Sequence, residues 1–271
     1  MIGVIRMATT TSSDGTTIAF DRGGDGPPLI LVDGAMCYRA SGPNGPLAAA
    51  LAEHFTVFTY DRRGRGDSDD TAPYAVEREV EDIQALIKEA GGSAHLYGIS
   101  SGAALALEAA DRGLPIERLA LYEAPFIVDD SRPPVPQDYK AQINRLIASE
   151  RRGDAIRLFM TKGVGLPAVM VAMMRFLPAW SKMKGVAHTL PYDVAFTVEH
   201  QRGKPLPAQQ WPSVTVPTLV VGGGKSPAWM RNGVRALADV LPNAQHHTLE
   251  GETHIVKPRA LAPVLTEFLN R

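Results

Sequence analysis

The stretch that decides the fold is AHLYGISSGAALALEAADRG, residues 94–113. It opens with a short apolar segment that is typical of a buried strand and closes with an Ala- and Leu-rich segment that is typical of a helix. Between them, residues 98–102 read Gly-x-Ser-x-Gly. A sharp strand-to-helix turn pushes the serine side chain out over the edge of the sheet, and it needs glycines because backbone segments approach closely there. The stretch therefore predicts Ser100 as a nucleophile at a helix N-terminus, where the helix dipole favours a developing negative charge.

Short apolar runs and helical patterns alternate on both sides of this stretch. Helical patterns cover residues 76–92 and 260–271, with apolar residues on one face. The expected strands are residues 27–34, 55–61, 93–98, 117–123, 216–224 and 245–251. Alternation of this kind requires crossover connections between strands. It predicts an α/β fold with a mostly parallel central sheet and helices on both faces.

One segment interrupts the alternation. Residues 127–212 show no clear strand, many prolines and the methionine-rich run LPAVMVAMMRFLPAW, residues 166–180. We expect residues 1–126 and 213–271 to form the core domain and residues 127–212 to form a helical cap or lid. The apolar residues of the run either pack inside the cap or line an apolar pocket, because methionine adapts to apolar ligands. We take Met174 and Trp180 as pocket residues.

Composition excludes several classes of protein. The chain has 271 residues, 45% of them hydrophobic and 21% charged, with a net charge of −1. This composition is typical of a soluble globular protein and lacks the basic stripe of a nucleic-acid binder. Cys37 is the only cysteine, so neither a disulfide framework nor a cysteine metal cluster is expected. We expect a cytoplasmic protein without metal or cofactor, acting on a small molecule away from membranes. The sequence is compatible with a homodimer but does not determine the oligomeric state.

A serine nucleophile needs a general base and donors for an oxyanion. Of the seven histidines, His254 lies in LEGETHIVKP, after the last expected strand and before the last helix. A loop at the carboxyl edge of a parallel sheet is where catalytic side chains gather, so His254 is the predicted base. The predicted oxyanion donors are the backbone N–H groups of Ser101, directly after the nucleophile, and of Ala35, in the turn after LILVDG.

These features together resemble the α/β-hydrolase superfamily. Five blocks carry the resemblance in the family's order: DGTTIAFDRGGDGPPLILVDG (14–34), YDRRGRGDSD (60–69), GISSG (98–102), VPTLVVGGG (216–224) and EGETH (250–254). The resemblance implies that residues 127–212 occupy the place of the family's cap, after the sixth strand. It also implies that YDRRGRGDSD is structural, with Arg62, Arg63, Arg65 and Asp67 paired among themselves.

The turn after the third strand departs from the family pattern. Many members carry His-Gly there, whereas this chain has Asp33-Gly34. A carboxylate aimed at the oxyanion would oppose the developing charge, so we expect Asp33 to turn away and pair with a nearby arginine. The alternative is a site adapted to a reaction other than ester hydrolysis. Asp33, Met36 and Cys37 are expected to border the substrate pocket, although Cys37 also fits a small buried residue.

The acid of the triad is the second departure. The family usually places an Asp after strand seven, where this chain has Lys225 and Ser226. Some relatives place the acid after strand six, and Glu123 stands there, long enough to span the extra distance. The remaining candidates are Asp129, Asp130, Asp193, Glu252, or no acid at all. A salt bridge to an arginine is the structural alternative for Glu123.

The leading interpretation is a serine hydrolase that cleaves an ester or related acyl compound through a Ser100 acyl-enzyme, with a small apolar substrate. Transfer of the acyl group to another acceptor is a close variant. A cofactor-free lyase or cyclase on the same fold is the second interpretation, and a non-catalytic ligand-binding homologue is the third.

Overall fold

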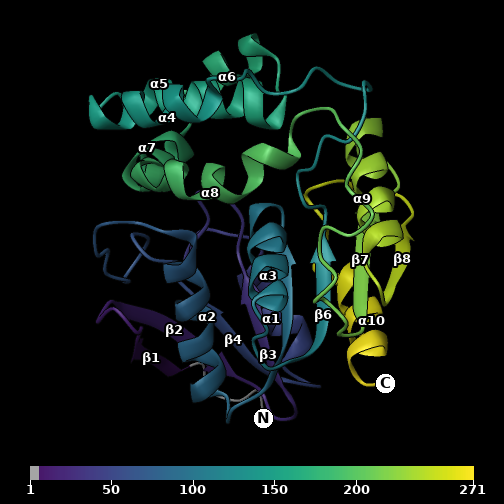
Figure 1. Cartoon of the computed structure of the whole chain (residues 1–271). Coiled ribbons are helices and arrows are strands. Elements are labelled where there is room, and N and C mark those ends of the chain that lie inside the picture. The colour runs from purple at the N-terminus through teal and green to yellow at the C-terminus, as the bar shows by residue number, and fades with distance from the viewer. Residues whose placement is uncertain (1–5) are drawn as a thin grey trace.

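Residues 6–271 are described by a computed structural model, which is built around one eight-stranded sheet (Figure 1). The strands follow the order β1-β2-β4-β3-β5-β6-β7-β8; β1 and β2 are antiparallel to their neighbours and the others run parallel. Their bounds are β1 Arg6–Thr11, β2 Thr17–Gly23, β3 Pro28–Val32, β4 Thr56–Tyr60, β5 Ala94–Ile99, β6 Ile116–Tyr122, β7 Thr218–Gly223 and β8 Ala244–Leu249. The predicted α/β class with a mostly parallel sheet is confirmed.

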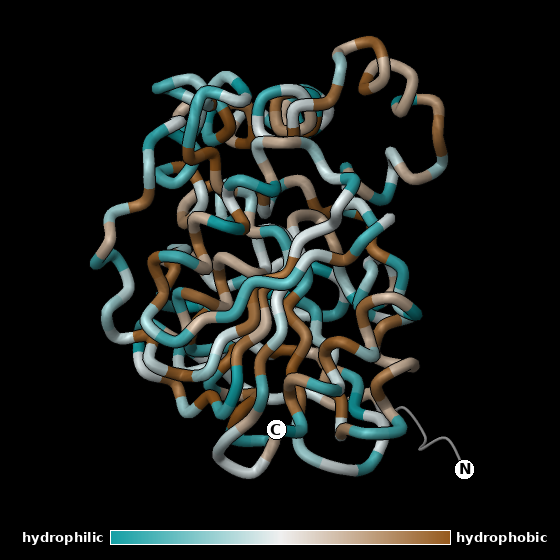
Figure 2. Tube along the Cα trace, turned by 90° about the vertical axis from the view of Figure 1, so that its right-hand side faces the viewer, coloured by the Kyte–Doolittle hydropathy of each residue, from teal (hydrophilic) through white to brown (hydrophobic). Residues whose placement is uncertain are grey.

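Helices cover both faces of this sheet. Those of the core are α1 Asn44–Leu51, α2 Val76–Glu89, α3 Ser101–Asp111, α9 Ala228–Val240 and α10 Pro258–Leu269. Side chains alternate along each strand: Leu96 of β5 packs in the cluster that contains α2, α3 and α9, whereas Tyr97 packs in the cluster with α1 and α10. The inner parallel strands β3 to β7 are largely hydrophobic and buried (Figure 2), as strands covered on both faces require, whereas the edge strand β8 is mostly polar and exposed.

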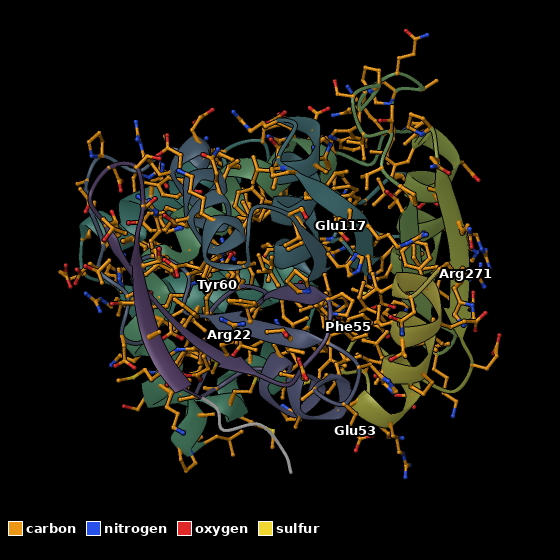
Figure 3. The ribbon with its side chains drawn as sticks, turned by 90° about the horizontal axis from the view of Figure 1, so that it is seen from below. Arg22, Glu53, Phe55, Tyr60, Glu117 and Arg271 are labelled. Atoms are coloured by element: carbon orange, nitrogen blue, oxygen red, sulfur yellow. The ribbon has the colours of Figure 1, made fainter. Side chains whose placement is uncertain are left out.

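The segment between β6 and β7, which we call the insertion, contains helices and no strand in its described residues. They are α4 Tyr139–Ala148, α5 Arg152–Leu158, η1 Phe159–Val164, α6 Ala168–Met174, α7 Pro178–Val186, η2 Ala187–Thr189, α8 Leu190–Thr197 and η3 Val198–His200. They lie across one end of the sheet, the end at which the parallel strands finish (Figure 1). The opposite end carries the strand starts, and Glu53, Phe55 and Glu117 lie there (Figure 3).

Two strands of the sheet, β1 and β2, are missing from the strands expected from the sequence. Arg6–Thr11 form the edge strand β1 along β2. An edge strand needs no buried apolar run, because one of its sides faces solvent.

None of the helices among residues 6–271 is long and apolar enough to cross a membrane.

Candidate active site

Ser100 lies in the turn between β5 and α3. Its backbone angles are φ 56° and ψ −127°, a conformation that costs a non-glycine residue about 1–3 kcal/mol and is retained where the surrounding structure enforces it. The N–H of Ser100 donates to the carbonyl of Tyr122 over 2.8 Å, which ties the turn to the end of β6. The strained residue thereby stands at the carboxyl end of the sheet, beneath the insertion.

The two glycines of the Gly-x-Ser-x-Gly motif are required by close packing. A Cβ atom on Gly98 would lie 2.3 Å from the carbonyl oxygen of Gly102, and one on Gly102 would lie 2.3 Å from that of Val32. Both distances are far below van der Waals contact. Any side chain at either position would therefore displace the turn that holds Ser100.

Glu123 and His254 meet next to this turn. The Nδ1 atom of His254 lies 2.8 Å from Oε2 of Glu123, whose other oxygen accepts the N–H of Gly223 over 2.7 Å. Glu123 has no exposed surface, while one third of the His254 side chain is exposed. A carboxylate at Nδ1 holds the proton there and leaves Nε2 unprotonated, the tautomer that a general base needs. The hydroxyl of Tyr122 donates to the carbonyl of Thr253 over 2.7 Å and fixes the loop beside the histidine.

Of the other candidate acids, Asp129, Asp193 and Glu252 are engaged elsewhere, and within residues 6–271 no hydrogen bond or ion pair joins Asp130 to His254. Asp129 binds Ser131 and Asn232, and Glu252 accepts the N–H of Lys257 over 3.0 Å. Asp193 lies in α8 and is bound by arginines. Of the candidates, the structure therefore brings only Glu123 to His254 among the described residues.

The two predicted oxyanion donors belong to segments next to Ser100: Ser101 follows it in the chain, and a Cβ on Gly34, the residue before Ala35, would lie 3.2 Å from the Cβ of Ser100. Ala35 belongs to a turn in which the N–H of Cys37 donates to the carbonyl of Gly34 over 3.3 Å, and Met36 has a φ of 58°. Ser101 is the first residue of α3, where N–H groups have no intrahelical acceptor. Ala35 lies outside the helices and strands, and within residues 6–271 its N–H donates to no backbone carbonyl.

Two adjoining cavities contain both Ser100 and His254. The larger cavity, of about 410 Å³, opens between the turn of residues 34–37 and the insertion. The smaller cavity, of about 40 Å³, extends toward α8 and α9. The larger is lined by Gly34, Ala35, Met36, Cys37, Pro43, Ile99, Ser100, Phe159, Met160, Val164, His254 and Ile255. Apolar side chains dominate its walls, as in pockets that take an apolar group.

The sequence-based list of pocket residues needs correction. Ala35, Met36 and Cys37 lie on the cavity wall as expected, but Met174 and Trp180 line neither cavity. Trp180 is buried in the core of the insertion, and the neighbouring apolar residues of its run face solvent, with Phe176 90% exposed. The wall is supplied instead by the π-helical turn η1, which includes Phe159, and by residues at the start of α9. The irregular turn gives no periodic signal in the sequence, so it was missed.

A family model described as the alpha/beta hydrolase family matches residues 29–264. The chain belongs to the alpha/beta hydrolase family. A solved alpha/beta hydrolase from Sphaerobacter thermophilus DSM 20745 is 56% identical, with a TM-score of 0.89 over 97% of this chain and 100% of that one. An enol-lactonase from Burkholderia xenovorans LB400 is 23% identical, with a TM-score of 0.69 over 97% of this chain and 100% of that one. An N-formylmaleamate deformylase from Pseudomonas putida is 36% identical over 107 residues, 38% of this chain and 39% of that protein.

Asp33 behaves differently from the expectation for this hydrolase. It is buried and lines neither cavity, so the expectation that it borders the pocket is wrong; among the described residues its carboxylate forms no ion pair, and its Oδ1 has no hydrogen-bond partner. The arginines bind the backbone instead: Arg62 reaches the carbonyl of Asp33 over 3.3 Å. Burial raises the pKa of Asp33 to about 7, with the positive charges of Arg65 and Arg62 opposing the rise. The predicted pairing with an arginine is therefore wrong, because those guanidinium groups have other acidic partners.

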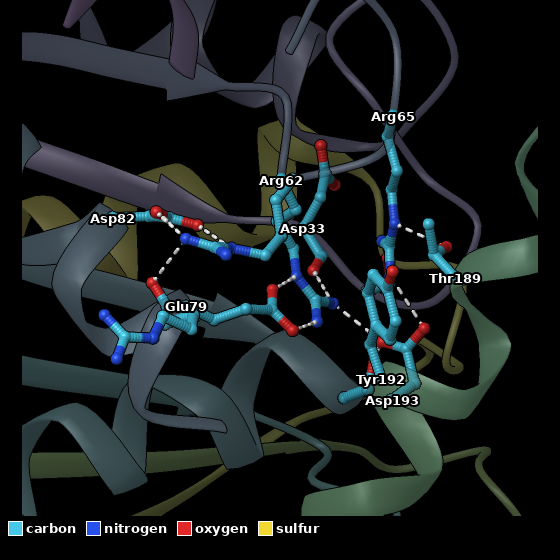
Figure 4. Close-up of polar contacts among 12 residues, drawn as sticks. Asp33, Arg62, Arg65, Glu79, Asp82, Thr189, Tyr192 and Asp193 are labelled. Atoms are coloured by element: carbon cyan, nitrogen blue, oxygen red, sulfur yellow. Dashed lines mark hydrogen bonds and ion pairs between the residues drawn. The ribbon is translucent and has the colours of Figure 1, made fainter. Parts of the chain in front are cut away.

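The arginines of YDRRGRGDSD do not pair with Asp67 as predicted. Arg62 binds Glu79 and Asp193, Arg63 binds Asp82 and Asp14, and Arg65 binds Asp193, as the close-up shows in part (Figure 4). Asp67 binds Arg39. The arginines are fully buried, and a buried charge needs a buried partner. Those partners come from α2, from the N-terminal hairpin and from the insertion, which is why local pairing fails.

Proposed function

We propose that this alpha/beta hydrolase is a serine hydrolase that cleaves an ester or a related acyl compound through an acyl-enzyme on Ser100. The observation that carries the proposal is the carboxylate of Glu123 held 2.8 Å from Nδ1 of His254, beside a strained serine turn. A loop histidine without a catalytic role has no need of a completely buried carboxylate that is itself fixed by a backbone N–H. The acid missing after β7 is thereby replaced from the end of β6.

The reaction divides into two acyl transfers. Oγ of Ser100 attacks the acyl carbon while Nε2 of His254 takes the hydroxyl proton, and the carboxylate of Glu123 stabilises the imidazolium. The N–H groups of Ala35 and Ser101 bind the oxyanion, and His254 returns the proton to the leaving group. Water then attacks the acyl-enzyme with His254 again as base, releasing the acid and restoring Ser100.

The cavity supports a small, apolar acyl group as substrate. Neither cavity that contains Ser100 is lined by a lysine or an arginine, and Met36, Phe159 and Val164 make the larger one apolar. The similarity to a deformylase over part of the chain extends the proposal to acyl carbon–nitrogen bonds. We also propose that the insertion acts as the cap that closes this pocket, and that the protein works in the cytoplasm.

Two features of the sequence favour a lyase, the carboxylate of Asp33 beside the oxyanion turn and the acid missing after β7, and the structure supports neither. Glu123 takes the place of the missing acid, and the carboxylate of Asp33 lines neither cavity, so it is not placed to exchange protons with a substrate there.

Turnover of p-nitrophenyl esters of increasing acyl length tests the proposal. The expected result is hydrolysis of short apolar esters and loss of that activity in Ser100→Ala, with Ser226→Ala as a control, because the buried Ser226 hydroxyl has no hydrogen-bond partner among residues 6–271 and lines neither cavity. Equal hydrolysis by Ser100→Ala and the native protein would contradict the nucleophile assignment.

A further inference from the structure

The guanidinium group of Arg65 binds the turn that carries one oxyanion donor. Its Nη1 donates to the carbonyl of Gly34 over 2.8 Å and to that of Cys37 over 3.3 Å. The carbonyl of Gly34 and the N–H of Ala35 belong to one peptide group, and in a trans peptide they point in opposite directions. A charged donor on the carbonyl therefore fixes the direction of the Ala35 N–H. It also polarises that peptide, because linked hydrogen bonds strengthen one another.

Arg65 is in turn held by the insertion. Its Nη2 lies 2.7 Å from Oδ2 of Asp193 in α8, and its Nε donates to the hydroxyl of Thr189 over 3.0 Å (Figure 4). The other oxygen of Asp193 accepts the hydroxyl of Ser101 over 2.8 Å. One carboxylate from the insertion thus binds the Ser101 side chain directly and, through Arg65, the carbonyl of the Gly34–Ala35 peptide.

The charges of the neighbouring buried side chains keep Asp193 ionised and paired with Arg65. Arg62 shares Asp193 over 2.7 Å and binds Glu79 over 2.6 Å, so two buried cations face two buried anions. Burial favours the neutral acid, but the charges of Arg65 and Arg62 outweigh it and lower the pKa of Asp193. Asp193 therefore stays ionised and keeps its ion pair with Arg65.

We propose that Arg65 is a positioning residue for the oxyanion site and that Asp193 couples this site to the insertion. The inference rests on the proposed acyl transfer at Ser100. When the insertion packs with Asp193 in place, the turn of Ala35 and the side chain of Ser101 are held for the transition state. When Asp193 withdraws, the donors lose their alignment although Ser100, His254 and Glu123 are intact.

The test compares Arg65→Gln with Arg63→Gln. Arg63 is a matched control because it is equally buried and paired, through Asp82 at 2.7 Å and Asp14 at 2.9 Å, but it binds neither the turn nor the insertion. The readouts are the second-order rate of Ser100 labelling by a fluorophosphonate, the kcat and KM of a p-nitrophenyl ester, and the melting temperature.

We expect Arg65→Gln to lower the labelling rate and kcat about ten- to hundredfold with little change in KM, somewhat less than the hundred- to thousandfold loss from deleting a donor. Arg63→Gln should lower the melting temperature by at least as much while keeping the native labelling rate. Arg65→Lys, which keeps a cation but not the forked geometry, should recover part of the rate. Asp193→Asn should reproduce the kcat loss.

Native labelling rates in Arg65→Gln and Asp193→Asn, at a lowered melting temperature, would overturn the inference and leave the residues with a structural role only. A native protein whose Ser100 does not react would overturn the proposed function and the inference with it. The two failures are distinguishable because only the second appears before any substitution is made.

Discussion

Glu123→Gln is the substitution that most sharply separates a catalytic acid from a buried structural carboxylate. The amide has nearly the same shape, and its oxygen can still accept the Gly223 N–H that Oε1 now accepts over 2.7 Å. Its NH₂ group then faces Nδ1 of His254 in place of Oε2, at 2.8 Å. An NH₂ group cannot accept a hydrogen bond from the ring N–H, so the ring moves its proton to Nε2 and can no longer act as base.

The expected loss is large. In a serine protease triad, replacing the acid by its amide lowers kcat about ten-thousandfold, which corresponds to roughly 5 kcal/mol of transition-state stabilisation. We expect a loss of this order in kcat for a p-nitrophenyl ester, with the melting temperature retained. Glu252→Gln is the matched control, since Glu252 stands two residues before His254 but binds Lys257. A kcat for Glu123→Gln within tenfold of that of Glu252→Gln would refute the assignment of the acid.

Three further predictions follow from buried groups near the site. Burial raises the pKa of Asp33 to about 7, so the folded chain keeps a proton that the unfolded chain loses above pH 4. The contribution of this group to the free energy of unfolding therefore falls by up to roughly 4 kcal/mol between pH 4 and 7. Asp33→Asn should remove that fall, and a difference from the native protein that does not change with pH in urea titrations would contradict the prediction. Burial, and to a lesser degree the charge of Asp33, raises the pKa of Cys37 to about 12. Iodoacetamide at pH 8 should therefore label this thiol only after unfolding. Rapid labelling of the native protein would show that the thiol ionises and would contradict the prediction. Gly98→Ala places a Cβ 2.3 Å from the carbonyl of Gly102 and should abolish fluorophosphonate labelling and lower the melting temperature, while Gly185→Ala, with nothing within 4 Å of its Cβ, should change neither.

Much of the candidate site could be predicted because its parts are local patterns at the ends of predicted strands. The Gly-x-Ser-x-Gly turn places Ser100, and the loop after the last strand places His254. Glu123 follows from topology: β6 pairs with β7 through Tyr122 and Val221, so an acid at the end of β6 stands one strand from the usual position.

The contacts of the insertion could not be predicted in the same way. Asp193 is 128 residues from Arg65, and neither the order of elements nor any local periodicity indicates that they pair. The apolar composition of the run predicts Met174 and Trp180 in the pocket. In the structure, some apolar residues of the run, such as Trp180, pack inside the insertion, and others, such as Phe176, face solvent. Which face of a short helix meets a cavity depends on tertiary packing rather than on the local sequence.

The central claim is that Ser100 is an activated nucleophile. The most direct measurement is the intact mass of the native protein after exposure to a fluorophosphonate, followed by peptide mapping, with Ser100→Ala in parallel. The account predicts one phosphonyl group per chain, on Ser100, and none on Ser100→Ala. A folded native protein that remains unlabelled, or a label that persists on Ser100→Ala, would contradict it.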